Sequence, residues 1–430
     1  MKRLQEEKVF KDPVHKYIYV QDKLIWDLIN TREFQRLRRI RQLGTSYLTF
    51  HGAEHSRFSH SMGVYEITRR IISQFLRAGY ADWPAEERLV CLCAALLHDL
   101  GHGPFSHSIE SVMQTDHETW SIRLVRGDTE VNRVLREVSG DLPDRVASVI
   151  SKTYEPQIAV SLISSQLDAD RMDYLLRDAY FTGVNYGTFD LDRILRVMRP
   201  YKGRIVIKES GMHAVEDYLM SRYQMYWQVY FHPVTRSSEI ILRKLAERAA
   251  YLYREDYPFR FMPEPLPQWF QGTLTEEQYV MLDESFLQMT IAQWCSETDP
   301  VLADLSRRFL NRRLFQYVTL QPEEEVDLDL LERLYRKAGL DPDYYLEVDT
   351  LSSLPYDVYR PGDSSGQLPI YMLNESGELE EISTRSPVVR SLCGTPVEAK
   401  HVYYPADRIV LPKSIARQTS KNERRTTDAF

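Results

Sequence analysis

The sequence predicts a mainly α-helical fold with a smaller C-terminal α+β region. Apolar residues recur at intervals of three and four over most of residues 20–320, which is typical of amphipathic helices. The run 89–97 is apolar throughout, as expected for a helix buried on all sides. After about residue 320 the pattern changes, and we expect three units: a helical domain over 1–320, an α+β region over 321–412 and a flexible tail over 413–430.

Several helices are predicted in the first half of the chain. The apolar spacing of residues 64–76 predicts a helix that Gly79 would end. Residues 86–100 predict the buried helix, stopped by a Gly-His-Gly-Pro sequence that follows it. Residues 159–180 predict one long helix that ends near Gly183.

The later elements are shorter. Residues 213–250 predict one or two helices, and 327–338 predict another. Residues 204–208 fit a small strand that interrupts the helical part. Pro-, Gly- and Ser-rich segments after residue 320 enclose short β-prone runs at 344–348, 368–373 and 402–404.

Composition excludes several classes of protein. The 54 basic and 62 acidic residues among 430 give a net charge of −8, which does not favour a protein that coats nucleic acid. The four cysteines form no Cys-x-x-Cys pair, so neither a thiolate zinc cluster nor a disulfide framework is expected. The charged N-terminus has no apolar core of a signal peptide, and the run 89–97 is too short to span a bilayer. We expect a soluble, cytoplasmic protein without membrane partners.

Histidines concentrate in one segment. Seven of the 11 histidines lie between residues 51 and 117, at positions 51, 55, 60, 98, 102, 107 and 117. Neutral imidazole binds metal ions and carries protons near neutral pH. His98 and Asp99 come at the end of the buried helix, where polar side chains need partners, and a metal ion is one such partner. An isolated His-Asp pair would more simply be a hydrogen bond at a helix end.

The pair is not isolated. Arg57-Phe58-Ser59-His60 precedes it, and Asp168-Ala169-Asp170-Arg171-Met172-Asp173-Tyr174 follows it. Together these segments resemble the HD-domain metal phosphohydrolases, whose ligands come in the order H…HD…D. The resemblance implies that His60, His98, Asp99 and Asp170 bind one divalent ion, with Asp168 as the neighbouring alternative to Asp170. Two imidazoles and two carboxylates suit Mg, Mn, Fe, Ni or Zn.

Longer motifs narrow the resemblance. Residues 8–15 (KVFKDPVH), 34–44 (FQRLRRIRQLG) and 98–107 (HDLGHGPFSH) look like the deoxynucleoside triphosphate (dNTP) triphosphohydrolase branch, which includes the sterile-alpha-motif HD enzyme of animals and its bacterial relatives. The matching motifs extend from about residue 8 to 232. The branch implies hydrolysis of a dNTP to the deoxynucleoside and inorganic triphosphate. Additional Mg bound to the nucleotide phosphates is compatible with this reaction.

The resemblance also implies catalytic residues. His102, His107 and His117 would line the phosphates, His117 would be the general acid, and Glu110 would hold an imidazole in its protonated form. Taken one at a time, His107 and His117 could equally be surface-loop histidines.

A substrate pocket is implied in the same way. Asp170, Tyr174 and Asp178 are spaced four apart and share a helix face, as do Arg222, Tyr226 and Tyr230. The resemblance assigns the sugar and its 3′-hydroxyl to Tyr174 and Asp178, and the side of the sugar at C2′ to Tyr230. Packing in a helical core would also explain these tyrosines. The resemblance also assigns Arg57, Arg171 and Arg222 to the phosphates and Gln42 and Leu43 to the sugar, with Tyr226 as a further residue of the pocket.

Regulation follows from the branch as well. Its members are often homotetramers activated by a dNTP or NTP at subunit interfaces, and Lys8, Val9, Gln35 and Arg38 match positions used there. A solvated helix face would equally explain the basic run 36–41. Three residues depart from the branch: Asn30 replaces a guanine-reading Asp, Lys16 replaces a Gly, and Tyr226 replaces a His.

Two other functions remain open at this level. One is a different HD phosphohydrolase, such as a nucleotidase, a phosphodiesterase or a single-strand nuclease. The other is a nucleotide-sensing or nucleic-acid-binding module that retains the fold, for which the basic run 36–41 would be the main feature. The intact ligand set argues against a degenerate site.

Overall fold

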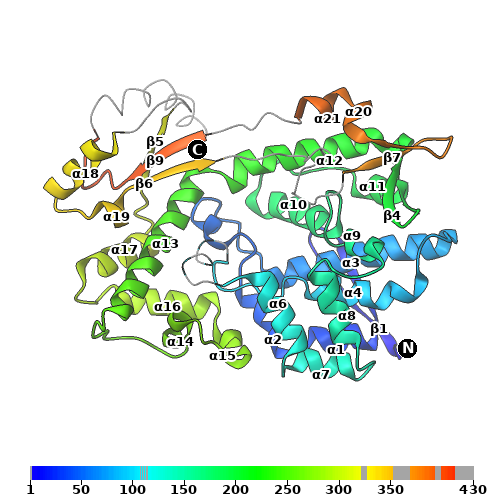
Figure 1. Ribbon diagram of the computed structural model, residues 1–430, viewed down its shortest axis with the longest axis horizontal. Coiled ribbons are helices and arrows are strands. Elements are labelled where there is room, and N and C mark those ends of the chain that lie inside the picture. Colours follow the sequence, from blue (N-terminus) through cyan, green and yellow to red (C-terminus); the bar gives the residue numbers. More distant parts are fainter. Residues whose placement is uncertain are drawn as a thin grey trace.

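The computed structural model describes residues 2–106, 108, 110, 112, 115–320, 327–351, 369–392 and 399–411. Within these ranges the chain is mainly helical, with small sheets at its periphery (Figure 1). The prediction for His107 and that for the tail 413–430 fall outside the described residues. No helix in the described part is both long and apolar enough to cross a membrane.

Three helices form the centre of the first half. Helix α4 (Arg88–Leu97) is buried from Leu89 to its end, as its apolar sequence predicts, and packs on α3 (Arg57–Ala78). Helix α3 also packs on α10 (Ala169–Thr182). The Ser56 side chain caps the start of α3, and Gly79 ends it with a left-handed φ of 68°. Around them lie α1 (Lys23–Ile29), α2 (Arg32–Arg36), η1 (Leu37–Arg39), η2 (Gly44–Leu48), η3 (Ala85–Glu87), α6 (His117–Arg126), α7 (Glu130–Arg136), α8 (Leu142–Ile150), α9 (Gln157–Ser161) and α11 (Leu191–Val197).

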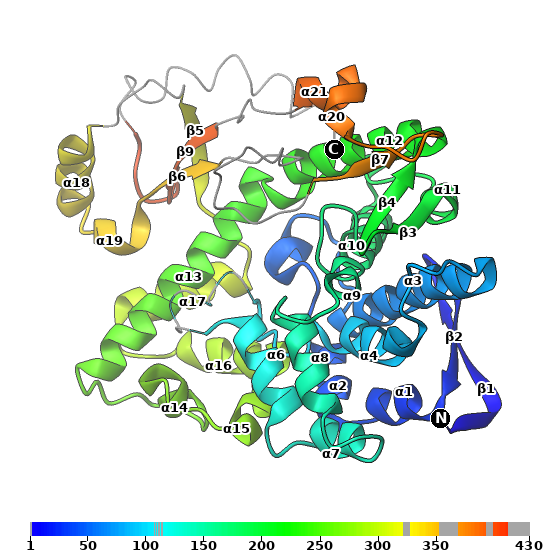
Figure 2. The same cartoon turned by 45° about the vertical axis from the view of Figure 1, so that its right-hand side comes forward.

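The second half is organised by a long helix, α13 (Pro233–Arg254), which begins beside the C-terminal sheet and runs away from it (Figure 2). It follows α12 (Met212–Met225) and a π-helical turn, η5 (Tyr226–Tyr230), so 213–250 contains two helices, as one of the predicted alternatives had it. Proline at the first position of α13 explains the break. The remaining helices here are α14 (Leu266–Gln271), α15 (Glu276–Met281), α16 (Glu284–Trp294) and α17 (Pro300–Leu310).

Three small sheets lie outside the helical core. Strands β1 (Arg3–Asp12) and β2 (Lys16–Asp22) form an antiparallel ribbon at one edge (Figure 2). A four-stranded sheet has the order β3-β4-β7-β8, and a three-stranded sheet has the order β5-β9-β6. Their strands are β3 (Met198–Tyr201), β4 (Arg204–Lys208), β5 (Gln316–Leu320), β6 (Glu347–Leu351), β7 (Tyr371–Leu373), β8 (Leu379–Glu381) and β9 (Ala399–Tyr404).

The C-terminal part contributes to two of these sheets. Strand β7 pairs in parallel with β4, although more than 160 residues separate them, whereas β9 pairs with both β5 and β6. Ion pairs of Arg236 with Asp349 and of Arg243 with Glu347 attach β6 to α13. The helices of this part are α18 (Leu328–Lys337), α19 (Pro342–Tyr345), α20 (Ile382–Arg385) and α21 (Pro387–Leu392).

One predicted helix is wrong. Residues 159–180 do not form a single helix, because the chain leaves helical geometry between α9 and α10. Asp168 explains the interruption: its carboxylate accepts the backbone N–H groups of Ser165 and Arg171, and so it caps α10. The predicted strand 204–208 is confirmed as β4, and Gly183 ends α10 as expected.

Candidate metal centre and active site

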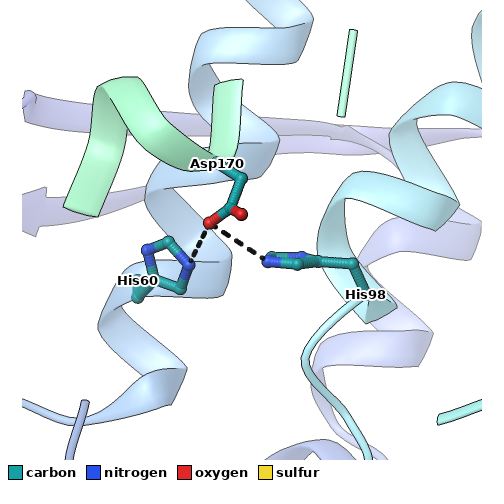
Figure 3. A group of neighbouring side chains, drawn as sticks. All are labelled: His60, His98 and Asp170. Carbon is teal, nitrogen blue, oxygen red and sulfur yellow. Dashed lines mark ion pairs between the residues drawn. The ribbon is translucent and has the colours of Figure 1, made fainter. Parts of the chain in front are cut away.

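The predicted metal ligands meet where three helices approach one another. His60 lies in the first turn of α3, His98 caps the end of α4, and Asp170 lies in the first turn of α10 (Figure 3). Asp170 Oδ1 is 3.1 Å from His60 Nε2 and 3.7 Å from His98 Nε2. Asp99 follows His98 and approaches the same imidazoles, at 3.3 Å from His98 Nε2 and 3.7 Å from His60 Nε2. His60, His98 and Asp170 therefore converge on one point, and Asp99 lies beside them.

The imidazoles are arranged as metal ligands. His60 Nδ1 bonds to Asp173 at 2.8 Å and His98 Nδ1 to the Ala95 carbonyl at 2.9 Å, which leaves both Nε2 atoms to face the cluster. Both Nε2 atoms are buried and have no hydrogen-bond partner among the described residues. A buried nitrogen without a partner is unfavourable unless an ion completes it. The donor set therefore fits a divalent metal ion, whose identity these ligands leave open among Mg, Mn, Fe, Ni and Zn.

Charge is concentrated at this point. Burial disfavours protonated His60, but Asp170 and Asp173 outweigh it and raise the pKa of His60 to about 10. Burial likewise opposes ionisation of Asp99 and Asp170, yet the surrounding imidazoles, and Arg57 beside Asp99, hold both pKa values below the usual range. A divalent ion held by these ligands would take the place of protons on the imidazoles.

Arg57 is bound to a metal-ligand residue in this structure. Its Nη1 donates to Asp99 Oδ2 at 2.5 Å, and its Nη2 donates to the Gln42 carbonyl at 3.4 Å. The guanidinium also lines the cavity described below. Arg57 thus lies at the boundary between the metal cluster and the space beside it.

A second cluster lies next to the first. His102 Nε2 is 3.2 Å from Asp99 Oδ1, and its ring stacks on His117 with centroids 4.0 Å apart. Glu110 Oε1 is 3.2 Å from His117 Nδ1. Gly101 permits this packing, because a β-carbon there would lie 2.2 Å from Ser121 N. The structure thus brings together three of the four predicted catalytic residues; the fourth, His107, is outside the described residues.

The two stacked imidazoles differ in their protonation. Burial and the positive charge of Arg57 lower the pKa of His102 well below its ordinary value. Burial also opposes protonation of His117, but the hydrogen bond and negative charge of Glu110 more than offset it and raise the pKa. The site therefore combines a neutral imidazole with one that is disposed to hold a proton.

A cavity of about 370 Å³ joins these clusters to an aromatic wall. Asp99, His102, His117 and Asp170 line one part of it. Predicted substrate residues also line it, namely Gln42, Leu43, Tyr174, Asp178, Tyr226 and Tyr230. The volume is within the range of small-molecule sites.

The aromatic wall is held by hydrogen bonds and ring contacts. Tyr230 donates to Asp178 Oδ2 at 2.8 Å, and His55 Nε2 contacts Asp178 Oδ1 at 2.7 Å. Tyr230 packs edge-on against Tyr174 and Tyr226. Tyr226 and Tyr230 begin and end the π-helical turn, a conformation that is frequent at functional sites.

Two predicted phosphate contacts do not line the cavity. Arg171 Nη1 donates to Asp168 at 2.5 Å, and Arg222 Nη1 donates to Gln166 at 2.7 Å. Asp168, the alternative metal ligand, is occupied by this pairing and by capping α10. The structure therefore places Asp170, rather than Asp168, in the cluster.

The predicted activator residues lie on the surface of the first half. Lys8 and Val9 are on β1, and Gln35 accepts a hydrogen bond from Arg38, whose guanidinium lies over the Phe58 ring. Of the departures from the resembled branch, Lys16 adopts a left-handed φ of 66°, which explains why glycine suits this position.

Sequence reasoning missed several residues of the site. Asp173 pairs with Arg177 in α10, and it also contacts the candidate metal ligand His60. His55 supports Asp178, and Glu239 from α13 lines the cavity. The one sequence signal for Asp173 is its spacing: it lies three residues after Asp170, and residues with this spacing share a face of a helix.

Comparison with known proteins agrees with this geometry. The "HD domain" family model matches residues 57–178, and the "HD associated region" model matches 189–256. An uncharacterised Bacillus subtilis protein, YwfO, is 60% identical over 408 residues, which are 95% of this chain and 94% of that protein.

Two further comparisons carry functional names. The zebrafish (Danio rerio) deoxynucleoside triphosphate triphosphohydrolase SAMHD1 is 29% identical over 274 residues, which are 55% of this chain and 44% of that protein. A crystal structure titled a phosphohydrolase, from Bacteroides thetaiotaomicron, superposes with a TM-score of 0.81 at 28% identity over 93% of this chain and all of that one. The chain therefore belongs to the HD-domain phosphohydrolase family, in the part of it that is related to the SAMHD1 triphosphohydrolases.

Proposed function

We propose that this protein hydrolyses dNTPs to deoxynucleosides and inorganic triphosphate at a metal ion held by His60, His98, Asp99 and Asp170. The observation that carries the proposal is the single cavity that joins the ligand cluster and two imidazoles to an aromatic, carboxylate-bearing wall. One end suits phosphates and the other suits a sugar and base. A divalent ion there would polarise the α-phosphate and lower the pKa of a water molecule.

The residues around the ion have distinct roles in this proposal. His117 donates a proton to the departing 5′-oxygen, and Glu110 keeps that proton available by its contact with Nδ1. His102 remains neutral and binds a phosphate oxygen as a hydrogen-bond donor. Arg57, which now pairs with Asp99, turns to the phosphates when a triphosphate enters. His107, which the resemblance also assigns to the phosphates, lies outside the described residues.

The aromatic wall supplies selectivity for the sugar. Asp178, which lines the cavity, accepts the 3′-hydroxyl, and Tyr174 packs against the sugar ring. Tyr230 occupies the side at C2′ and disfavours ribose, and Gln42, Leu43 and Tyr226 complete the contacts. Arg171 donates to Asp168, and Arg222 donates to Gln166. Each would have to give up this hydrogen bond to reach a phosphate.

We also propose activation by a dNTP or NTP in a homotetramer. Lys8, Val9, Gln35 and Arg38 would bind the activator, and Val9, which is 49% exposed, would be covered by a neighbouring subunit. Light scattering with and without a mixture of dNTPs tests this assembly. A particle of one subunit under every condition would contradict it.

Product analysis tests the reaction. The purified protein is incubated with each dNTP, singly and mixed, with Mg²⁺ or Mn²⁺, and the products are resolved by ion-exchange chromatography. Deoxynucleoside with intact triphosphate is the expected result, and activity only in the mixture would indicate an activator. Release of phosphate or pyrophosphate would instead identify a different HD phosphohydrolase, and ribonucleotides serve as the matched control.

A further inference from the structure

A buried carboxylate behind the metal ligands has no role in the reaction proposed above. Asp173 has a fully buried side chain, and four N–H groups surround it. His60 Nδ1 contacts Oδ2 at 2.8 Å, and His15 Nε2 contacts Oδ1 at 2.6 Å. The Arg177 guanidinium donates to both oxygens, at 2.8 and 2.9 Å. A carboxylate satisfied on all sides in this way is fixed in position.

The partners of Asp173 lead to the N-terminal ribbon. Arg177, which is itself fully buried, donates to both carboxylate oxygens of Asp12, at 2.8 and 3.3 Å. Asp12 ends β1, and its Oδ1 also accepts the backbone N–H groups of Val14 and His15. The turn between β1 and β2 is therefore built around the same carboxylate that holds Arg177.

Gly63 shows how closely this network is packed against α3. A β-carbon at Gly63 would lie 1.8 Å from Asp173 Oδ1 and 2.5 Å from Arg177 Nη2. No side chain larger than hydrogen fits there without displacing Asp173. Gly63 is in α3, three residues after His60, so the helix that carries the ligand also leaves room for its support.

We propose that the β1–β2 turn is part of the support of the metal centre. Asp12 and His15 hold Asp173, directly or through Arg177, in the orientation that fixes the Nδ1–H tautomer of His60 and presents its Nε2 to the ion. His15, Arg177 and Asp12 are thus positioning residues, which touch neither the metal ion nor the substrate. The proposal rests on the metal centre assigned above but not on the identity of the substrate.

The physical basis is the behaviour of partners behind metal ligands. A carboxylate that accepts the distal N–H of a ligating imidazole fixes its tautomer and ring orientation and raises its basicity, and its loss costs about 10–100-fold in metal affinity. Asp12 reaches His60 through Arg177 and Asp173, so it is further from the ligand than a direct partner. Its loss would let Arg177 and Asp173 shift, but both would remain. A smaller effect of the same sign is expected.

The experiment measures Mn²⁺ affinity of the full-length, metal-free protein by titration calorimetry, without nucleotide. Asp12→Asn is compared with Asp407→Asn, because each removes the charge of an Asp that pairs with a buried Arg, Arg177 or Arg308. We expect Asp12→Asn to raise the Mn²⁺ Kd between about twofold and tenfold, below the range for a direct partner. Asp407→Asn should leave the Kd at the wild-type value, even where both variants lower the melting temperature.

Two outcomes overturn the proposal: an unchanged Kd in Asp12→Asn, or an equal rise in both variants, which would reflect general loss of stability. Asp173→Asn provides a stronger test, with an expected rise of about 10–100-fold. Asp173→Asn leaves the buried Arg177 partly unpaired and could fail to fold for that reason. In that case the result for Asp12→Asn decides between the outcomes. Wild-type protein that binds no divalent ion would refute the metal assignment itself, whereas absent dNTP hydrolysis with the expected Kd pattern would refute only the substrate.

Discussion

The two halves of the catalytic cavity are held in different ways. On the metal side, the His60 side chain is 1% exposed, and the Nδ1 atoms of both ligating imidazoles are bonded to fixed acceptors. On the other side, the His117 side chain is 24% exposed, and Glu110 is the acceptor on its Nδ1. The candidate metal ligands are thus held by packed helices, whereas His117, at the start of α6, is held by Glu110. Substitutions in the two halves should therefore have separable effects.

The largest effect is expected from the metal ligands. His98→Ala or Asp99→Ala should reduce hydrolysis by more than about a hundredfold, since loss of a mere supporting residue already costs about 10–100-fold. Metal analysis of the purified variants should show loss of bound ion, and circular dichroism should show the helical fold intact. Normal turnover in either variant would refute the ligand assignment.

His117→Ala should separate the two halves. Loss of a general acid costs about 10²–10⁴-fold in turnover, but the metal ligands are untouched. Turnover with a dNTP and the content of bound metal are measured on the same sample, with His213→Ala, which changes an exposed histidine in α12, as the control. Loss of metal together with activity would show that the halves are not independent.

The pH dependence sharpens the role of Glu110. Glu110 raises the pKa of His117, so its removal by Glu110→Gln should lower that pKa. Because the acid must be protonated, turnover falls as pH rises through this pKa, and the alkaline limb of the kcat profile should move to lower pH in the variant. If the alkaline limb lies at the same pH in Glu110→Gln and in the unmodified protein, His117 is not the group whose titration produces that limb. The raised pKa of His117 also contributes to folding stability. This contribution is present at low pH and is lost as pH rises through the pKa of His117 in the folded protein.

Sugar selectivity should depend on Tyr230. The unmodified protein should prefer dNTPs to NTPs, by up to about a hundredfold for rejection of one hydroxyl by shape alone. Tyr230→Ala should reduce this ratio of kcat/KM values, whereas Tyr230→Phe keeps the ring and removes only the hydrogen bond to Asp178. Equal use of both sugars by the unmodified protein would contradict the assignment.

The smallest effect concerns the ribbon. Lys16 has a φ of 66°, a conformation that costs a residue with a side chain about 1–2 kcal/mol. Glycine removes this cost but adds freedom to the unfolded chain, so Lys16→Gly should stabilise by about 1 kcal/mol or less. Chemical denaturation measures this difference, with Lys11→Gly at a strand position as a control that should destabilise. A less stable Lys16→Gly variant would contradict the strain argument.

Local signals in the sequence predict much of the fold. The apolar spacing before Gly79 and the continuous apolar run before His98 correspond to α3 and α4, because each helix is defined by its own residues and caps. The break before α10 was missed, since the capping role of Asp168 depends on a loop that folds back on it. The ribbon of β1 and β2 was missed too, because its alternating burial is weak and its turn requires Lys16 in an unusual conformation.

Contacts distant in sequence could not be predicted in this way. The parallel pairing of β4 with β7 depends on residues more than 160 positions apart, and neither strand indicates its partner. The same holds within the site: Asp173 and Arg177 form an i, i+4 ion pair, but only the structure shows that the pair is buried against Gly63 and reaches Asp12. A helix pattern indicates which residues share a face but not what that face meets.

The order of strands in the C-terminal sheet has a consequence for biosynthesis. Strand β9 lies between β5 and β6, so neither earlier strand has its hydrogen-bonding partner until residues 399–404 have been made. At about 5–20 residues per second, the chain needs about 3–10 s to pass from the end of β6 to the end of β9. During that interval two strand edges are open to pairing with other nascent chains, a hazard of any unpaired edge. Chaperones that shield such edges should therefore improve the yield of this protein more than they change its final stability.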